Sequence, residues 1–338
     1  MTNNIYDEKQ LATIVFKTCY GYSCDNINFT RLESASPNIN WLVQNNDYAF
    51  VLRKCMINNN QDYFNYLEQI IDLLNSYGIP VPQLIMAKDG QKEVYCEGNW
   101  WQLRLYIDGR PYKTSDISDA LETAKLLCKL HTIPVSNIET IHFIHDPYYW
   151  LLNPDKEIEN LEYFLKTNRK DKDEVIKKYK LLVKDALKYI DIERYNILNR
   201  SIIHGDFHGN NLVFVNNSIS GLLDFDFISV NARIIDVAQS VYLMARKQRG
   251  SFVLDKNIIL KYLEIYNECH KLSHLEYHAM IPLLQLRLLP RSEYLVELDK
   301  KAPHLLNWQL EWSLNAASHA REQLIEAIKI ASETNICT

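Results

Sequence analysis

The hydrophobic pattern changes near residue 110, and this change limits the folds open to a chain of 338 residues more than any other feature. Before it, short β-branched and aromatic runs are separated by polar turns, as in strands. After Ser115, apolar residues recur every three or four positions, as in amphipathic helices. We therefore predict an α+β protein with a β-rich N-terminal part, residues 1–109, and a mostly helical C-terminal part, residues 110–338.

The N-terminal part has the pattern of a small antiparallel sheet with one main helix. Residues 38–43 and 48–53 predict the two strands of a hairpin, because a short polar turn joins them. Residues 62–77 have apolar side chains at helical spacing, and Gly78 follows where a C-cap belongs. Further strands are expected at residues 84–87, 92–95 and 100–107.

The composition argues against several kinds of partner. A net charge of −5 does not favour the basic face that nucleic-acid phosphates require. No segment approaches 18 uninterrupted apolar residues, and the N-terminus has no basic region before an apolar core, so neither a membrane span nor a signal peptide is expected. The seven cysteines show no metal-ligand spacing and are odd in number, which predicts a reduced, cytoplasmic protein. The oligomeric state is not set by the sequence.

Three oxygen-bearing side chains stand at a defined spacing in residues 201–227. Asp206 and Asn211 are five residues apart, and Asp224 follows thirteen residues later. The residues between Asn211 and Asp224 predict a hairpin with the turn Asn216-Asn217-Ser218, so the two side chains are expected to face one cation. Mg²⁺ prefers such hard oxygen ligands. Asp206 is then placed to accept a proton from a substrate hydroxyl, which is the arrangement that phosphoryl transfer requires.

The same residues resemble the aminoglycoside phosphotransferase family of small-molecule kinases. The resemblance rests on Leu223-Asp224-Phe225 and on His204-Gly205-Asp206-x-His208-x-x-Asn211. Relative to protein kinases, Gly205 replaces the Arg of the H-R-D motif and Asp226 replaces the Gly of D-F-G. The resemblance implies a bilobal, protein-kinase-like fold, with a nucleotide-binding lobe and hinge in residues 1–109 and a catalytic and substrate-binding lobe in residues 110–338.

The resemblance also assigns roles in the reaction. It implies that Asp206 is the catalytic base, that Asn211 and Asp224 bind Mg²⁺, and that ATP is the phosphate donor. His208 lies inside the motif, where a role in bracing the loop is favoured over contact with the substrate. Asp226 either contacts a substrate amine or hydroxyl, or faces water. Asp236 opens a helix and either bonds back to the catalytic loop or complements the helix dipole.

The resemblance further implies a cation on an N-terminal strand that holds the phosphates. The family register favours Arg53, and Lys54 is the alternative because alternation puts it on the opposite face. Glu68 is the expected partner of this cation, with Asp72 one turn further along. The hinge that hydrogen-bonds adenine through its backbone is expected at residues 103–106, in particular at Leu103, Leu105 and Tyr106. A glycine-rich phosphate loop is absent, since residues 32–37 contain no glycine.

The acceptor is left open between several small molecules. Residues 38–43, 78–82 and 221–227 look like segments of bacterial homoserine kinases, whereas residues 98–109 are similar to sugar and N-acetylhexosamine kinases. The acceptor is therefore the hydroxyl of an amino alcohol such as homoserine or of a sugar, with an aminoglycoside or another antibiotic as a further option. The missing glycine loop and the Arg in place of Lys motivate a second hypothesis from a different class, a catalytically weak structural or regulatory protein of the spore-coat type. A protein kinase is disfavoured because no A-P-E motif follows Asp224.

Overall fold

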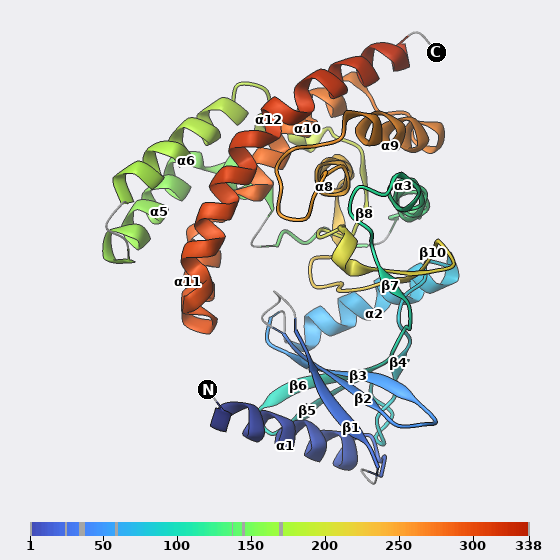
Figure 1. The fold of residues 1–338 in the computed structure, drawn as a ribbon. Coiled ribbons are helices and arrows are strands. Elements are labelled where there is room, and N and C mark those ends of the chain that lie inside the picture. The colour runs from blue at the N-terminus through green and yellow to red at the C-terminus, as the bar shows by residue number, and fades with distance from the viewer. Residues whose placement is uncertain are drawn as a thin grey trace. The chain divides into compact units, whose positions relative to one another are not determined.

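The computed structural model describes residues 2–23, 26–33, 38–57, 60–136, 138–143, 146–168 and 172–336. The chain separates into two compact units, each described by itself (Figure 1). The first comprises Met1–Arg110 together with Ser220–Asp226, and the second comprises Pro111–Ile219 and Phe227–Thr338. The sequence placed residues 220–226 with the C-terminal part, whereas in the structure this segment, which carries Asp224, packs with the first unit.

The first unit is built on a six-stranded sheet with the order β1-β2-β3-β6-β4, in which β5 also pairs with β6. Every pairing is antiparallel, which confirms the predicted sheet. The main helix predicted at residues 62–77 is also present, as α2. The elements are α1 Thr2–Thr18, β1 Asn28–Leu32, β2 Ile39–Gln44, β3 Ala49–Cys55, α2 Gln61–Ser76, β4 Leu84–Ile85, β5 Glu93–Cys96 and β6 Asn99–Leu105.

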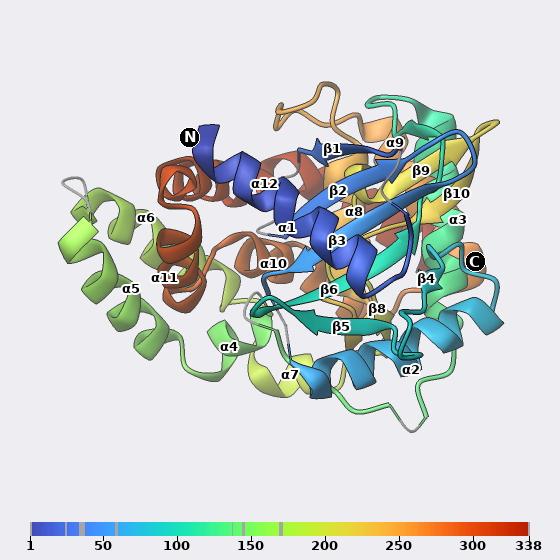
Figure 2. The same ribbon diagram turned by 90° about the horizontal axis from the view of Figure 1, so that it is seen from below.

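The two faces of this sheet differ in chemistry. Helix α1 lies across one face (Figure 2), where Phe16 packs into a core with Leu52 and Leu103. Side chains alternate along a strand, so the residues that flank Leu52 and Leu103 point to the opposite face. That opposite face carries three buried polar residues on the central strands, namely Arg53, Gln102 and Arg104.

The second unit is mostly helical, as predicted. Helix α10 lies in its interior and packs against α6, α8 and α12 (Figure 1). The helices are α3 Ile117–His131, α4 Pro147–Leu152, α5 Pro154–Asn168, α6 Lys172–Ala186, α7 Ile192–Asn196, α8 Ile234–Met244, α9 Lys256–Cys269, α10 His274–Leu288, α11 Ser292–Lys301 and α12 Leu306–Ile336. The remaining strands are β7 Arg110–Pro111, β8 Arg200–Ile203, β9 Leu212–Val215, β10 Ser218–Leu222 and β11 Ser229–Ala232. No helix among the described residues is both long enough and apolar enough to cross a membrane.

The turn between β9 and β10 follows the sequence prediction closely. Asn216 and Asn217 have φ values of 49° and 63°. Two consecutive residues with positive φ make the tight turn that matches the twist of a hairpin, and asparagine tolerates this conformation. The turn is two residues long, because Ser218 already belongs to β10.

A buried ion pair joins the beginnings of α8 and α10. Arg233 Nε donates to Glu276 Oε1 at 2.7 Å, and Arg233 Nη2 donates to Glu276 Oε2 at 3.1 Å. Glu276 also closes the capping box of α10 by accepting the backbone N–H of Ser273. Burial raises the pKa of Glu276, but the hydrogen bonds from Arg233 and Ser273 outweigh this effect and hold the pKa below its ordinary value.

We expect Glu276→Gln to lower the free energy of unfolding at neutral pH by about 3–5 kcal/mol, because it leaves the buried Arg233 charge without a counter-ion. Since the pKa of Glu276 is depressed in the folded state, this stabilisation is present above the ordinary glutamate pKa and is lost as the pH falls through the folded value. Urea denaturation at pH 7 and at about pH 3.5 measures both effects. The exposed pair Lys178–Glu174 is the control: Glu174→Gln should change stability by less than about 1 kcal/mol. A loss of similar size in the two variants would contradict the prediction.

Candidate active site

The loop that carries Asp206 begins where β8 ends, and it depends on a glycine. Strand β8 pairs with β11 in an antiparallel arrangement that sets Ile203 opposite Ser229. Two residues after Ile203, Gly205 has a φ of 75°, a conformation that costs a residue with a Cβ atom about 1–2 kcal/mol. A Cβ atom at Gly205 would also collide with the carbonyl oxygen of Phe227. The arginine that protein kinases carry at this motif position therefore does not fit here.

One buried carboxylate holds the backbone of this loop. Asp236, in the first turn of α8, accepts the backbone N–H of His204 at 2.6 Å and that of Gly205 at 3.0 Å. Its side chain is fully buried. The sequence left two roles open for Asp236, and the structure shows the bond back to the loop.

Asp206 is surrounded by hydrogen-bond donors of the second unit. Its carboxylate oxygens lie 3.1 Å from His208 Nε2 and 3.0 Å from Gln239 Nε2. Asn211 Nδ2 donates to the backbone oxygen of Asp206 at 2.9 Å. Gln239 was not found from the sequence, although its position three residues after Asp236 puts both on one face of α8.

These neighbours keep Asp206 ionised. Burial raises the pKa of a carboxyl group, but His208, Arg287 and His204 favour the charged form, so the pKa of Asp206 lies well below its ordinary value. An ionised carboxylate only accepts hydrogen bonds. Asp206 therefore suits a group that orients a hydroxyl and takes its proton during transfer.

His208 braces the loop at two points. In addition to its contact with Asp206, it caps the short 3₁₀ turn Gly209–Asn211 by accepting the backbone N–H of Asn210 on Nδ1 at 3.2 Å. These contacts agree with the bracing role that the sequence favoured.

In the first unit, Arg53 is the buried cation that holds Asp224 and Asp226. Its Nη1 lies 3.3 Å from Asp224 Oδ1, and its Nη2 donates to Asp226 Oδ1. Asn38 Nδ2 donates to the other oxygen of Asp226 at 2.6 Å. Lys54 points to the opposite face, where it pairs with Glu8 at 3.1 Å. Arg53 and Lys54 therefore lie on opposite faces of the sheet, as the alternation predicted.

The two aspartates share one cation and differ in exposure. Asp226 is buried, and this burial raises its pKa to about 6 in spite of Arg53, with the nearby charge of Asp224 adding to the shift. The side chain of Asp224 is 29% exposed, so its carboxylate remains accessible. Asp224 also has a φ of 62°, a rare conformation for a residue with a side chain, and such residues concentrate at functional sites. The burial of Asp226 does not fit the reading in which it faces water.

One expectation about the nucleotide site needs correction. Glu68 does not pair with Arg53, because it lies 2.5 Å from Lys92, which also contacts Asp72 at 3.5 Å. The glutamate side chain is 43% exposed, whereas Arg53 is buried and already held by two aspartates.

The residues of the expected hinge take part in backbone hydrogen bonds of the first unit. The backbone N–H of Leu105 donates to Gln83, and that of Tyr106 donates to Ala49. Leu103 is paired with Leu52 within the sheet, and its side chain is buried in the α1 core. The N–H groups of Leu105 and Tyr106 are therefore already used within the first unit, and a backbone contact to adenine through these residues stays a prediction.

The two predicted magnesium ligands, Asn211 and Asp224, each have an oxygen donor. Asn211 makes its contacts with Asp206 and His208 through Nδ2, so the amide oxygen is the atom suited to a cation. Asp224 supplies an accessible carboxylate. Among the described residues, no group of three or more His, Cys, Asp or Glu side chains is arranged to hold a metal ion. Mg²⁺ does not need such a group, since it is commonly bound by one or two carboxylates together with substrate phosphates.

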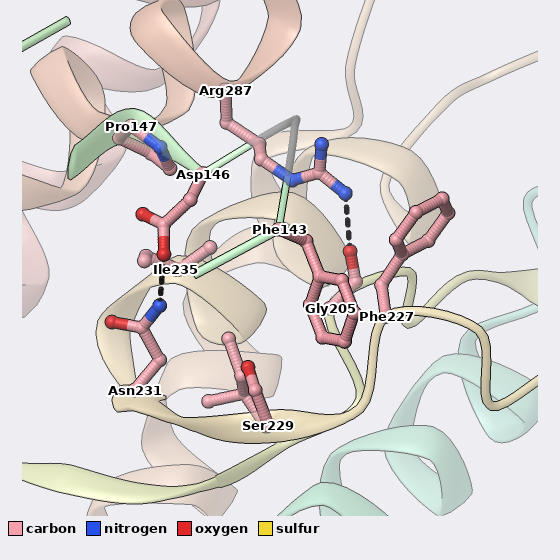
Figure 3. A pocket seen from close by; sticks show the side chains of 10 residues that line it. Phe143, Asp146, Pro147, Gly205, Phe227, Ser229, Asn231, Ile235 and Arg287 are labelled. Atoms are coloured by element: carbon pink, nitrogen blue, oxygen red, sulfur yellow. Dashed lines mark hydrogen bonds between the residues drawn. The ribbon is translucent and has the colours of Figure 1, made fainter. Parts of the chain in front are cut away.

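A small cavity lies beside the loop in the second unit (Figure 3). Its volume of about 20 Å³ accommodates roughly one water molecule. Arg287 lines it, donates to the carbonyl oxygen of Gly205 and lies over the ring of Phe227. Asp146, on the other side, is held by His142 at 2.7 Å and by Tyr195 at 3.0 Å. The cavity is too small for a metabolite and belongs to the frame behind the loop.

Comparisons with known proteins show the family of the chain. The model of a family described as "Phosphotransferase enzyme family" matches residues 28–264, which is more than half of the chain. The chain belongs to this family, and it is a small-molecule kinase. A homoserine kinase from Zymomonas mobilis subsp. mobilis is 24% identical over 248 residues, covering 73% of this chain and 74% of the relative.

Solved structures confirm the protein-kinase-like fold. A microcompartment-associated aminopropanol kinase superposes with a TM-score of 0.63 at 16% identity, covering 96% of this chain and 98% of the other. An amicoumacin kinase, solved with AMP-PNP, Ca²⁺ and Ami, superposes with a TM-score of 0.62 at 15% identity, covering 93% and 96% of the two chains. The fold predicted from the sequence is therefore correct.

The structure predicts that Gly205→Ala is more damaging than alanine at another left-handed glycine. Gly250 has a φ of 81° and nothing within 4 Å of an added Cβ, so Gly250→Ala causes backbone strain alone. Gly205→Ala adds the collision with Phe227, and we expect it to lower the free energy of unfolding by about 2 kcal/mol more. Urea denaturation of both variants measures the difference. Equal losses would show that the approach of Phe227 does not limit this position.

Proposed function

We propose that the protein transfers the γ-phosphoryl group of a nucleoside triphosphate to a hydroxyl of a small metabolite. ATP is the donor that the family resemblance implies, and an amino alcohol such as homoserine is the favoured acceptor. The observation that carries the proposal is the position of Asp206, on a loop held by Asp236 and bounded by His208, Gln239 and Asn211. The homoserine kinases that match over about three quarters of the chain support this choice of acceptor.

In this proposal the chain's own residues position the reactants. Asp206 accepts the hydrogen bond of the acceptor hydroxyl, which orients the oxygen toward the phosphorus atom, and it takes the proton as the new bond forms. Asn211 and Asp224 are the proposed Mg²⁺ ligands, and the ion, when bound, neutralises charge on the phosphate oxygens. Arg53 orients Asp224 through their contact of 3.3 Å and is the proposed cation next to the phosphates. Asp226 holds Arg53 in place through a second ion pair, at Nη2.

The proposal predicts that Asp206→Asn lowers kcat by about 10²–10⁴-fold, because the amide is a poor proton acceptor. The fold should be retained, since an amide of equal size still reaches Gln239. Transfer is measured as nucleotide consumption with homoserine, other amino alcohols, hexoses, hexosamines and aminoglycosides. Asp47→Asn, in an exposed turn, is the matched control and should stay within about twofold of the unchanged protein. Unchanged turnover in Asp206→Asn would exclude Asp206 as the base.

The proposal also predicts that Asp224→Asn weakens the binding of the Mg²⁺ complex of ADP by at least about tenfold, because a charged ligand is lost. Binding of ADP in the presence of a chelator should change little. A thermal-shift titration measures both affinities, since a ligand that binds only the folded state raises Tm. If no nucleotide raises the Tm of the unchanged protein, the chain is a structural or regulatory relative and not an active kinase.

A further inference from the structure

Arg104 is a second buried arginine of the first unit, and its surroundings differ from those of Arg53. Its side chain lies in β6, and the residue is only 8% exposed. Nη2 donates to Gln102 Oε1 at 2.6 Å, whereas the buried Nε has no hydrogen-bond partner in the described part of the chain. Gln102 in turn donates to Glu93 at 2.8 Å, so the amide links Arg104 to this carboxylate.

This arrangement leaves a buried positive charge without direct compensation. Arg53 has two carboxylates at hydrogen-bond distance, but no carboxylate among the described residues forms an ion pair with Arg104. Burial and the positive charge of Arg53 lower the pKa of Arg104, and the negative charges of Asp226 and Asp224 offset this lowering only in part. A buried guanidinium without a direct counter-ion is costly, so the Nη groups of Arg104 favour a ligand that offers hydrogen-bond acceptors.

The strand register locates this site relative to the proposed phosphate end. Gln102 lies opposite Arg53, and Arg104 lies opposite Val51 on the same face of the sheet. Two residues along a strand are about 7 Å, so Arg104 is displaced by that distance from the level of Arg53. On its other side Arg104 is paired with Leu84. The aliphatic residues Val51 and Leu84 are thus the strand neighbours of Arg104. Such surroundings suit a flat heterocycle better than a phosphate.

Guanine and adenine present different hydrogen-bonding groups to such a site. The edge of guanine presents N7 and O6, which are both acceptors and match an arginine in a bidentate contact. Adenine presents N7 as an acceptor but an amino group as a donor at the neighbouring position, and this donor opposes the guanidinium. We propose that Arg104 binds the N7 and C6 edge of the purine, and that the protein therefore uses 6-oxopurine nucleotides, GTP and ITP, in preference to ATP. This inference rests on the proposed phosphotransferase function.

The test compares GDP, IDP and ADP by calorimetric titration, which needs no acceptor molecule. We expect the unchanged protein to bind GDP and IDP about tenfold more tightly than ADP. IDP lacks the 2-amino group of guanine, so equal binding of GDP and IDP assigns the preference to O6. Arg104→Met keeps a long apolar side chain without donors, and it should reduce the affinity for GDP and IDP to that for ADP.

Two further variants make the test specific. Arg104→Lys keeps the charge but loses the paired donors, so it should also lose the preference if the contact is bidentate. Arg31→Met changes an exposed arginine of β1 in the same unit and should leave the preference unchanged. Circular dichroism checks that each variant is folded, and the comparison in the unchanged protein does not depend on any variant.

The possible failures are distinct. Equal affinity of the unchanged protein for GDP and ADP would overturn the inference and leave the phosphotransferase proposal standing. An equal loss of GDP and ADP binding in Arg104→Met would place the arginine at the phosphates or ribose and would also overturn the inference. The absence of binding by all three nucleotides would overturn the proposed function together with the inference.

Discussion

The loop that carries Asp206 depends on the buried carboxylate of Asp236. A loop without regular secondary structure has no ladder to satisfy its backbone donors, so another group must accept them. Asp236 accepts two consecutive N–H groups, those of His204 and Gly205, and it does so from the first turn of a helix in the core of the second unit. In this buried setting the bonds are strong, and leaving the donors unsatisfied would be costly. This contact and the left-handed Gly205 set the direction in which the side chain of Asp206 points.

The first unit has two buried arginines on one face of the sheet, and carboxylates pair directly with the charge of only one of them among the described residues. Arg53 is held by Asp224 and Asp226, which come from a segment about 170 residues later in the chain. This pairing brings the segment into the first unit and explains how buried charges are accommodated there. Arg104, two residues further along β6 than Gln102, has an amide as its hydrogen-bond partner within the described part of the chain. The contrast separates an arginine that organises the fold from one that is suited to a ligand.

The sequence was most informative where structure depends on near neighbours. The helix at residues 61–76 follows from apolar spacing, and the turn at Asn216 and Asn217 follows from the tolerance of asparagine for positive φ. The prediction that Glu68 pairs with Arg53 was wrong, because this contact depends on residues far apart in the chain. Helical spacing correctly put Glu68 and Asp72 on one face, but it could not show that Lys92 approaches that face from another strand. Gln239 was missed because its role depends on how α8 meets the loop.

By itself, the sequence determined the α+β class, the kinase-like fold and the family, because a motif with defined spacing and local turn chemistry is read along the chain. Only the tertiary structure decided which donors and acceptors meet. It showed that the N–H groups of Leu105 and Tyr106 are taken by neighbouring segments of the first unit, and that Arg104 is buried beside an amide instead of a carboxylate. Such partners are far apart in the chain, and burial makes their pairing or lack of pairing energetically decisive.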